Sequence, residues 1–217
     1  MRIKLALALA LLPAMLWAQG QDTVFYHKEL PPAVVIGGKT KEKVLVRPGS
    51  KVADGHATGA ISLRSEDELG RELGSVANVK KPFLVKDITF RINENTIPGC
   101  VAAINIYRME ESLVNVLQKP IHFDVAVSDS PQRFNLHPNE TLLLEPGRYF
   151  IAFQIVDCDR PAFQRFLAKP AEEQDYWEFS MYFTLHLKSS YTRETARGDL
   201  KSYPFNMGIA VKGLEYQ

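Results

Sequence analysis

The sequence predicts a mostly β protein: an antiparallel two-sheet β-sandwich, jelly-roll-like, with one or two short helices in its loops. Three observations support this prediction. Hydrophobic residues recur at every second position in several segments, which is the period of a strand with one buried face. Turn-forming residues separate these segments about every 10 to 20 residues. No segment has the long helical periodicity that parallel crossover connections require.

The clearest alternation covers residues 176–188. If this segment is extended, six hydrophobic residues share one face: Trp177, Phe179, Met181, Phe183, Leu185 and Leu187. Tyr176, Tyr182 and His186 fall on the opposite face, among mostly polar neighbours. A helix would distribute the hydrophobic residues around its whole circumference, so the pattern predicts a strand with those six side chains in the core.

Five further segments are predicted to be strands: 84–92, 101–107, 121–127, 149–156 and 205–211. In three of them hydrophobic residues alternate, and the expected inward residues include Ile88, Phe90, Ile92, Ile121, Phe123, Val125, Val127, Phe205, Met207, Ile209 and Val211. The segments 101–107 and 149–156 are hydrophobic at nearly every position. That pattern predicts central strands with both faces covered.

Two short helices are expected in loops between these strands. One covers residues 66–72, with Ser65 as its N-cap, and the other covers residues 161–168, with Asp159 as its N-cap. Both cap residues carry a side-chain oxygen that can accept a bond from an unpaired backbone N–H of the first turn.

Residues 1–20 are predicted to be a signal peptide. Two cations precede an uncharged run of 13 residues from Leu5 to Trp17, which is too short to span a membrane because a span requires about 20. Small residues follow at Ala18 and Gly20, the positions that a signal peptidase reads. The mature protein is therefore expected in the periplasm, at the cell surface or in the medium, with no transmembrane segment after cleavage.

Residues 60–217 are expected to form the sandwich domain, and residues 21–59 an N-terminal arm or edge strands. The net charge of the chain is +1, and its cations and anions are spread along the sequence. No basic field is therefore expected to attract nucleic acid, and nucleic-acid binding is excluded. The sequence leaves the oligomeric state open.

The two cysteines, Cys100 and Cys158, both lie in the part that is expected to be exported. An isolated pair of thiols usually forms a disulfide in an oxidising compartment, and we expect one here. The alternation of the strands opposes the bond. Cys100 is in phase with Ile104, which is expected in the core, whereas Cys158 is in phase with Gln154, so the two sulfurs would point to opposite faces. The disulfide therefore requires a β-bulge or a flared strand end, and the alternative is two buried free thiols.

Several short runs from residue 72 onward occur in a familiar order. They are Glu72-Leu73-Gly74, Val79-Lys80-Lys81, Phe90-Arg91-Ile92, Ile104-Asn105-Ile106-Tyr107, Tyr191-Thr192-Arg193-Glu194-Thr195 and Gly208-Ile209-Ala210-Val211. Over residues 60–217 the chain resembles a β-sandwich module of exported Bacteroidetes proteins, which often follows a carboxypeptidase-like regulatory domain. The resemblance implies a jelly-roll-like sandwich on an exported protein, and it assigns no catalytic residue.

Motifs of catalysis are missing from the sequence. It contains neither the Gly-x-Ser-x-Gly elbow of serine hydrolases nor the Gly-x-x-x-x-Gly-Lys-Ser/Thr loop that holds phosphates. Its five histidines stand far apart without the spacing of metal ligands. We therefore predict no catalytic residue, no metal ligand and no cofactor, and the interpretation leans away from an enzyme.

Tyr176, Tyr182 and His186 are the candidate ligand-binding residues, on the outward face of the aromatic strand. Flat rings beside polar groups bind sugars by stacking on their C–H surfaces. The alternative is ordinary cross-strand packing, because aromatic residues favour strands.

The sequence thus favours a non-enzymatic, exported binding or interaction module of the bacterial envelope, with an envelope glycan or protein as its partner. One alternative is a polysaccharide-acting hydrolase whose carboxylates are brought together by the fold. Another is a structural or adhesin subunit, in which the arm or an edge strand pairs with a neighbouring chain.

Overall fold

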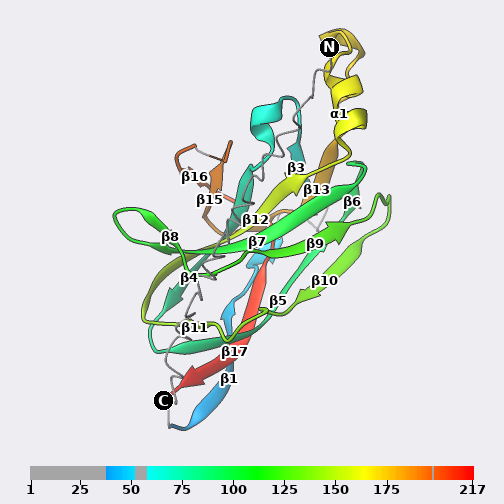
Figure 1. Cartoon of the computed structure of the whole chain (residues 1–217). Helices are drawn as coiled ribbons and strands as arrows, with labels where there is room; N and C mark the ends of the chain where they lie inside the picture. The colour runs from blue at the N-terminus through cyan, green and yellow to red at the C-terminus, as the bar shows by residue number, and fades with distance from the viewer. Residues whose placement is uncertain (1–37, 52–57, 197) are drawn as a thin grey trace, which may run out of the picture. The chain divides into compact units, whose positions relative to one another are not determined.

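The computed structural model describes residues 38–51, 58–196 and 198–217, which form an antiparallel β-sandwich of two main sheets (Figure 1). The predicted signal peptide lies outside these residues. The strands are β1 (Thr40–Val46), β2 (Ser50–Lys51), β3 (Thr58–Ser62), β4 (Glu72–Val79), β5 (Phe83–Ile92), β6 (Glu94–Asn95), β7 (Cys100–Met109), β8 (Leu113–Asn115), β9 (Ile121–Val125), β10 (Gln132–Leu136), β11 (Leu143–Leu144), β12 (Gly147–Asp157), β13 (Ser180–Thr184), β14 (His186–Leu187), β15 (Ser190–Arg193), β16 (Lys201–Tyr203) and β17 (Ala210–Tyr216). The helical elements are η2 (Glu66–Glu68), α1 (Arg160–Leu167) and η3 (Ala171–Glu173).

The larger sheet has seven strands in the order β16-β15-β4-β12-β7-β8, with β9 also paired to β7. The second has five strands in the order β1-β17-β5-β10, with β11 paired to β5. Two small sheets, β3-β13-β6 and β14-β2, complete the fold. The chain passes repeatedly from one main sheet to the other, from β4 to β5, back to β7, on to β10 and back to β12, which is a jelly-roll-like path.

The hydrophobic core lies between the two main sheets. Phe90 of β5 and Phe153 of β12 meet edge to face there, with ring centroids 5.9 Å apart. Phe183 of β13 packs edge-on against Phe153 at 5.7 Å. All three rings are buried, so one aromatic cluster joins the two main sheets and a small one.

The predicted strand 84–92 is confirmed as β5, and its Ile88, Phe90 and Ile92 are buried. The prediction of central strands is also confirmed. In β12 every side chain from residue 149 to residue 153 is buried, because the strand lies between β4 and β7 and both of its faces are covered. A strand that is hydrophobic at nearly every position has no polar face to expose to water, so this pattern correctly predicted that both faces are buried.

Two predicted strands are displaced or shortened at one end. β9 ends at Val125, and Val127 is 60% exposed instead of facing the core. In the segment 205–211 the strand begins only at Ala210, after Gly208 takes a φ of +76°. The left-handed residue interrupts the extended backbone, which has negative φ. Met207, Ile209 and Val211 are nevertheless buried as expected, whereas Phe205 is only half-buried.

The prediction of one strand over residues 176–188 is correct in part, because the segment holds two strands, β13 (Ser180–Thr184) and β14 (His186–Leu187). Four of the six expected core residues are buried: Phe179, Met181, Phe183 and Leu185. At the ends of the segment Trp177 is 58% exposed and Leu187 is 56% exposed, whereas Tyr182, expected outside, is buried. Turns before Ser180 change the direction of the side chains, and a period of two in the sequence does not reveal such turns.

Helix α1 is confirmed close to its predicted position. Asp159 accepts a hydrogen bond from the Ala162 N–H at 3.0 Å, which satisfies one unpaired donor of the first turn. Phe163 and Phe166 are three residues apart and bury the inner face of the helix. The other predicted helix is only the single 3-10 turn η2, where Ser65 makes no side-chain capping bond.

The predicted disulfide is wrong: Cys100 and Cys158 are both free and buried. A β-bulge between Ile155 and Asp157 shifts the strand phase, and both cysteines belong to the core cluster. Burial raises the pKa of the Cys100 thiol to about 12 and that of Cys158 to about 11. The thiolate that disulfide formation requires is therefore scarce at neutral pH.

We expect a thiol reagent such as DTNB to label the native protein slowly at pH 8 and to find two thiols per chain after unfolding in guanidinium. Burial and the raised pKa values protect both sulfurs in the native state, and unfolding removes both effects. Protein purified without reductant that shows no titratable thiol after unfolding would contradict this assignment.

Candidate functional site

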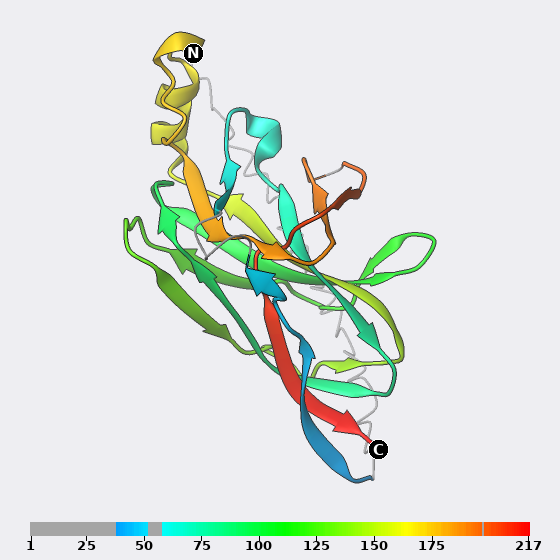
Figure 2. The same ribbon diagram turned by 180° about the vertical axis from the view of Figure 1, so that it is seen from behind.

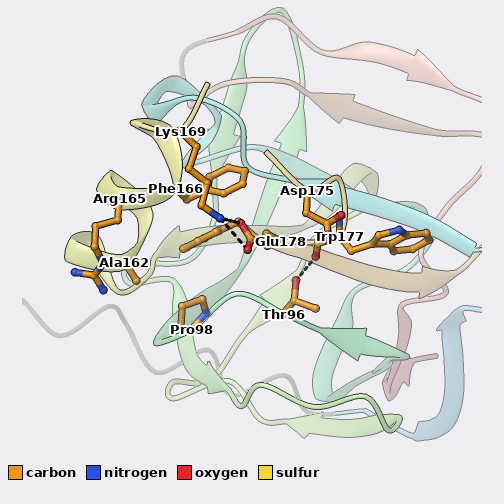
Figure 3. Close-up of a pocket in the computed structure, with 10 residues that line it drawn as sticks. Thr96, Pro98, Ala162, Arg165, Phe166, Lys169, Asp175, Trp177 and Glu178 are labelled. Atoms are coloured by element: carbon orange, nitrogen blue, oxygen red, sulfur yellow. Dashed lines mark hydrogen bonds and ion pairs between the residues drawn. The ribbon is translucent and has the colours of Figure 1, made fainter. Parts of the chain in front are cut away.

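A pocket of about 440 Å³ opens between helix α1 and the turn that precedes β13. Its principal side chains come from these two segments: Arg165, Phe166, Lys169, Asp175, Trp177 and Glu178. Figure 3 shows Arg165 and the indole of Trp177 on opposite sides of the pocket. The pocket thus combines an aromatic ring at one side with charged groups of both signs.

Two large aromatic side chains stand exposed at this turn. Tyr176 is 61% exposed and Trp177 is 58% exposed. Their rings meet edge to face with centroids 5.8 Å apart, and Trp177 also covers Tyr182 at 5.2 Å. Exposed aromatic rings of this size leave a hydrophobic surface in contact with water, which is typical of binding sites.

Side-chain bonds hold the turn in place. Asp175 Oδ1 accepts a bond from the Trp177 N–H at 3.0 Å, which closes an Asx turn. Thr96 donates its hydroxyl to the Trp177 carbonyl at 2.6 Å, and the same hydroxyl accepts the Ser180 N–H at 3.0 Å. Figure 3 shows the contact between Thr96 and the Trp177 backbone. The exposed indole is therefore carried by a backbone fixed on both sides.

Phe179, at the end of the turn, has a φ of +49°. An aromatic residue in this left-handed region is an outlier, because its side chain crowds the backbone there. The ring is held between Phe163 and Phe166 of α1, with centroids 5.1 and 5.0 Å away. Packing on the helix compensates the strain, and the strained residue turns the preceding segment toward the pocket.

Arg64 connects the turn to helix α1. Its guanidinium donates to the Glu178 carbonyl at 2.8 Å and to the Tyr176 carbonyl. It also lies over the rings of Phe166 and Tyr176, at 5.2 and 5.5 Å from their centroids. One cation therefore satisfies two turn carbonyls and stacks on two aromatic rings, which orders the site before any ligand arrives.

The charged groups of the pocket are partly paired. Lys169 Nζ lies 2.7 and 3.0 Å from the two carboxylate oxygens of Glu178. Among the residues that the structure describes, Arg165 makes no ion pair. The pocket therefore offers a cation in addition to a neutralised pair, with the donors and acceptors that a polyhydroxylated ligand needs.

The structure brings together only part of the predicted binding surface. Tyr176 stands beside the pocket and is exposed, as expected. Tyr182 is 5% exposed and supports the indole of Trp177 from behind. His186 lies in β14, where its Nδ1 is 3.2 Å from the Gly49 carbonyl and its backbone pairs with Asn206. None of the three predicted binding residues, Tyr176, Tyr182 and His186, lines the pocket itself.

Sequence reasoning missed the exposed indole that lines the pocket, because Trp177 was assigned to the core. It also missed Arg165 and Lys169, which approach the turn only through the fold. One local signal was available: Asp175 immediately precedes the two aromatic residues, and Asp is a residue that starts turns.

A second polar cluster is buried on the face of the seven-stranded sheet that points away from the core. Glu72 of β4 is 0% exposed and accepts from the Tyr107 hydroxyl at 2.7 Å through Oε1. Its Oε2 accepts from Arg193 Nε at 3.0 Å and from Nη2 at 2.6 Å. Asn105 adds a longer bond of 3.3 Å.

Burial raises the pKa of Glu72, and the contacts with Tyr107 and Arg193 oppose this shift. The ring of Tyr107 lies under the Arg193 guanidinium at 5.3 Å. Because the carboxylate is closed off from solvent, this cluster cannot reach a substrate as it stands. The cluster joins β15 to β4, because Arg193 of β15 lies opposite Glu72 of β4 in the ladder between these two strands.

Groups of three or more side chains that could hold a metal ion are absent from the described part of the chain. Within the same part, no helix has the length and hydropathy of a membrane span. No family model, curated protein or solved structure matches this chain. The pocket beside Trp177 is therefore the feature of this chain that bears on its function.

Proposed function

We propose that this protein is a non-enzymatic glycan-binding module of the bacterial envelope, and that the pocket beside Trp177 is its binding site. The observation that carries the proposal is the exposure of Trp177, 58%, on a turn that Thr96 and Asp175 hold in place. A large ring kept in water by a fixed backbone costs hydrophobic free energy, which a stacked ligand would recover.

The chemistry of the pocket suits a sugar. An indole offers a flat face to the C–H surface of a pyranose ring, while Arg165, Lys169 and Glu178 supply donors and acceptors for hydroxyl groups. A volume of about 440 Å³ is within the range of small-molecule sites, about 300–1,000 Å³. A short segment of a glycan chain is the expected ligand.

The carboxylates of the pocket favour binding over hydrolysis. A glycoside hydrolase needs one carboxyl group free to act as acid and another to act as base or nucleophile. Both oxygens of Glu178 are occupied by Lys169, and Asp175 accepts the Trp177 N–H. Each carboxylate therefore already has a structural partner.

The charges on the edge strand β1 make the structural-subunit alternative weaker than glycan binding. β1 is at the edge of the five-stranded sheet, where a neighbouring chain would add a strand. It carries Lys41, Glu42 and Lys43 at exposed positions, and charges along an edge discourage such pairing.

Export to the periplasm or the cell surface remains part of the proposal. It is supported by the N-terminal sequence, with two cations, a short apolar run and small residues after it. The resemblance to exported Bacteroidetes modules agrees with this location.

Trp177→Ala is expected to weaken binding of a glycan found by array screening by about tenfold or more, because the stacking surface is lost. Isothermal titration of the full chain measures the change. Leu187→Ala, which removes another exposed apolar side chain, 56% exposed and outside the pocket, is the matched control. The proposal fails if no glycan binds the unmodified protein, or if both variants lose binding equally.

A further inference from the structure

Two arginines lie side by side on the surface of the five-stranded sheet. Arg91 of β5 is the direct partner of Arg133 of β10 in the ladder between these strands. Phe90, the residue before Arg91, is buried in the core, so both arginine side chains are on the face that points away from the core. Both are exposed. β10 is an edge strand, at the opposite edge of the sheet from β1 (blue in Figure 2).

This register brings two like charges together. Directly opposite residues of an antiparallel pair have Cβ atoms about 4.5–5.5 Å apart, and like charges in this position destabilise the sheet. Within the described ranges, neither Arg91 nor Arg133 makes an ion pair. The repulsion between the two guanidinium groups is therefore not relieved by a carboxylate of this part of the chain.

Acidic residues of the same two strands are distant from the pair. The acidic residue of β5 is Asp87, four residues from Arg91 and about 13 Å away along the strand. Asp87 already lies 3.0 Å from His137 Nδ1, and it is opposite Lys212 in the ladder with β17. The sequence of β10, Gln132–Leu136, contains no acidic residue. Neither strand therefore supplies a counter-charge beside the two arginines.

Protection of the sheet edge accounts for only one of the two charges. Charged side chains on an edge strand discourage pairing with another chain, which explains Arg133 on β10. Arg91 is on β5, which has β17 on one side and β10 on the other, so its charge protects no edge. An anionic ligand would remove the repulsion that Arg91 adds.

A concave surface of about 470 Å³ lies at the pair. Its lining includes both arginines and, in the next outward row of the same ladder, Thr89 and Asn135. Among the described residues that line it, none is acidic. The surface therefore combines two guanidinium groups with a hydroxyl and an amide, which are all able to donate hydrogen bonds.

Part of this surface is held by a buried side chain. Pro48 and Gly208 also line it, and Asn206, which is 0% exposed, bonds to both. Asn206 Nδ2 donates to the Pro48 carbonyl at 3.1 Å, and Asn206 Oδ1 accepts from the Gly208 N–H at 2.8 Å. The concave shape therefore does not depend on the arginine side chains alone.

We infer that Arg91 and Arg133 bind a terminal phosphate group, that is, a phosphate monoester. A guanidinium group donates two parallel hydrogen bonds to an oxyanion in a fixed planar geometry. A phosphate monoester carries a charge of about −1.5 to −2 at pH 7 and three strong acceptor oxygens, so a single group can face both arginines. A carboxylate has a single charge and two oxygens, which match one guanidinium group.

The site is independent of the Trp177 pocket, since no residue lines both. It also differs from that pocket in chemistry, because it selects charge and not the apolar face of a sugar. The inference does not rest on glycan binding, and either site can fail without the other.

The test is titration of the full chain, at low ionic strength, with glucose 6-phosphate, inorganic phosphate and vesicles that contain phosphatidic acid. These three probes distinguish a phosphorylated sugar, free phosphate and a lipid headgroup as the source of the group. We expect the double variant Arg91→Gln and Arg133→Gln to bind the preferred probe roughly tenfold more weakly. The double variant Lys80→Gln and Lys81→Gln, at exposed lysines between β4 and β5 and outside the concave surface, makes the same change in net charge and should bind normally.

Four results would overturn the inference. Equal losses in the two double variants would indicate attraction by net charge alone, and acetate binding as tight as phosphate binding would exclude selection of a phosphate. Absence of binding to all three probes would remove the site. Loss of binding in the Trp177→Ala variant would place the ligand in the other pocket. Thermal melting verifies that each variant is folded, and phosphate should raise the melting temperature of the unmodified chain but not that of the arginine variant.

Discussion

Replacement of Glu72 by alanine is expected to lower the free energy of unfolding by about 3–5 kcal/mol. The substitution leaves the Arg193 guanidinium, with its side chain 15% exposed, without the carboxylate that compensates its charge. It also removes the acceptor of the Tyr107 hydroxyl. A buried cation that loses its partner bears the full cost of desolvation, which the pair had offset.

Urea unfolding followed by circular dichroism measures this loss. Glu194→Ala is the matched control, because it breaks another Arg–Glu pair, with Arg71, whose side chains are 24% and 40% exposed. We expect that variant to lose less than about 1 kcal/mol, since water solvates the cation left behind. Similar losses in the two variants would mean that the Glu72 cluster does not pin the sheet as inferred.

Phe153→Ala is expected to destabilise the protein by about 3–5 kcal/mol. Phe153 is 0% exposed at the centre of β12 and contacts aromatic rings from other strands, among them Phe90 at 5.9 Å and Phe183 at 5.7 Å. Truncation removes the buried ring and leaves a cavity between the sheets that rigid strands cannot close.

The midpoint of urea unfolding measures this effect, with Val127→Ala as its control. Val127 was expected in the same core but is 60% exposed, so its truncation should change stability by less than about 0.5 kcal/mol. A large loss in the Val127 variant, or a small one in the Phe153 variant, would contradict the location of the core.

Regular strands were the part of the fold that could be predicted. Ile88, Phe90 and Ile92 alternate in sequence and are all buried in β5. The alternation works there because the register of β5 is regular from Ile88 to Ile92. At Trp177 the same pattern misled, since the Asx turn at Asp175 and the positive φ of Phe179 interrupt the extended backbone before the strand begins, and the indole is exposed.

The candidate sites were less accessible to prediction than the strands. Trp177 has the spacing of a core residue, and the turn that exposes it is held by Thr96 and Arg64, which are distant in sequence.

The sequence by itself determined that this chain folds as antiparallel strands around a hydrophobic core, because burial of alternate side chains is a local consequence of extended backbone. It also determined the Asp159 cap of helix α1, which depends on neighbouring residues alone. Only the tertiary structure decided which aromatic rings remain in water and that the two thiols stay free in the core. These features arise from bulges, turns and contacts between distant segments, whose energies depend on the assembled sheets and have no local pattern in the sequence.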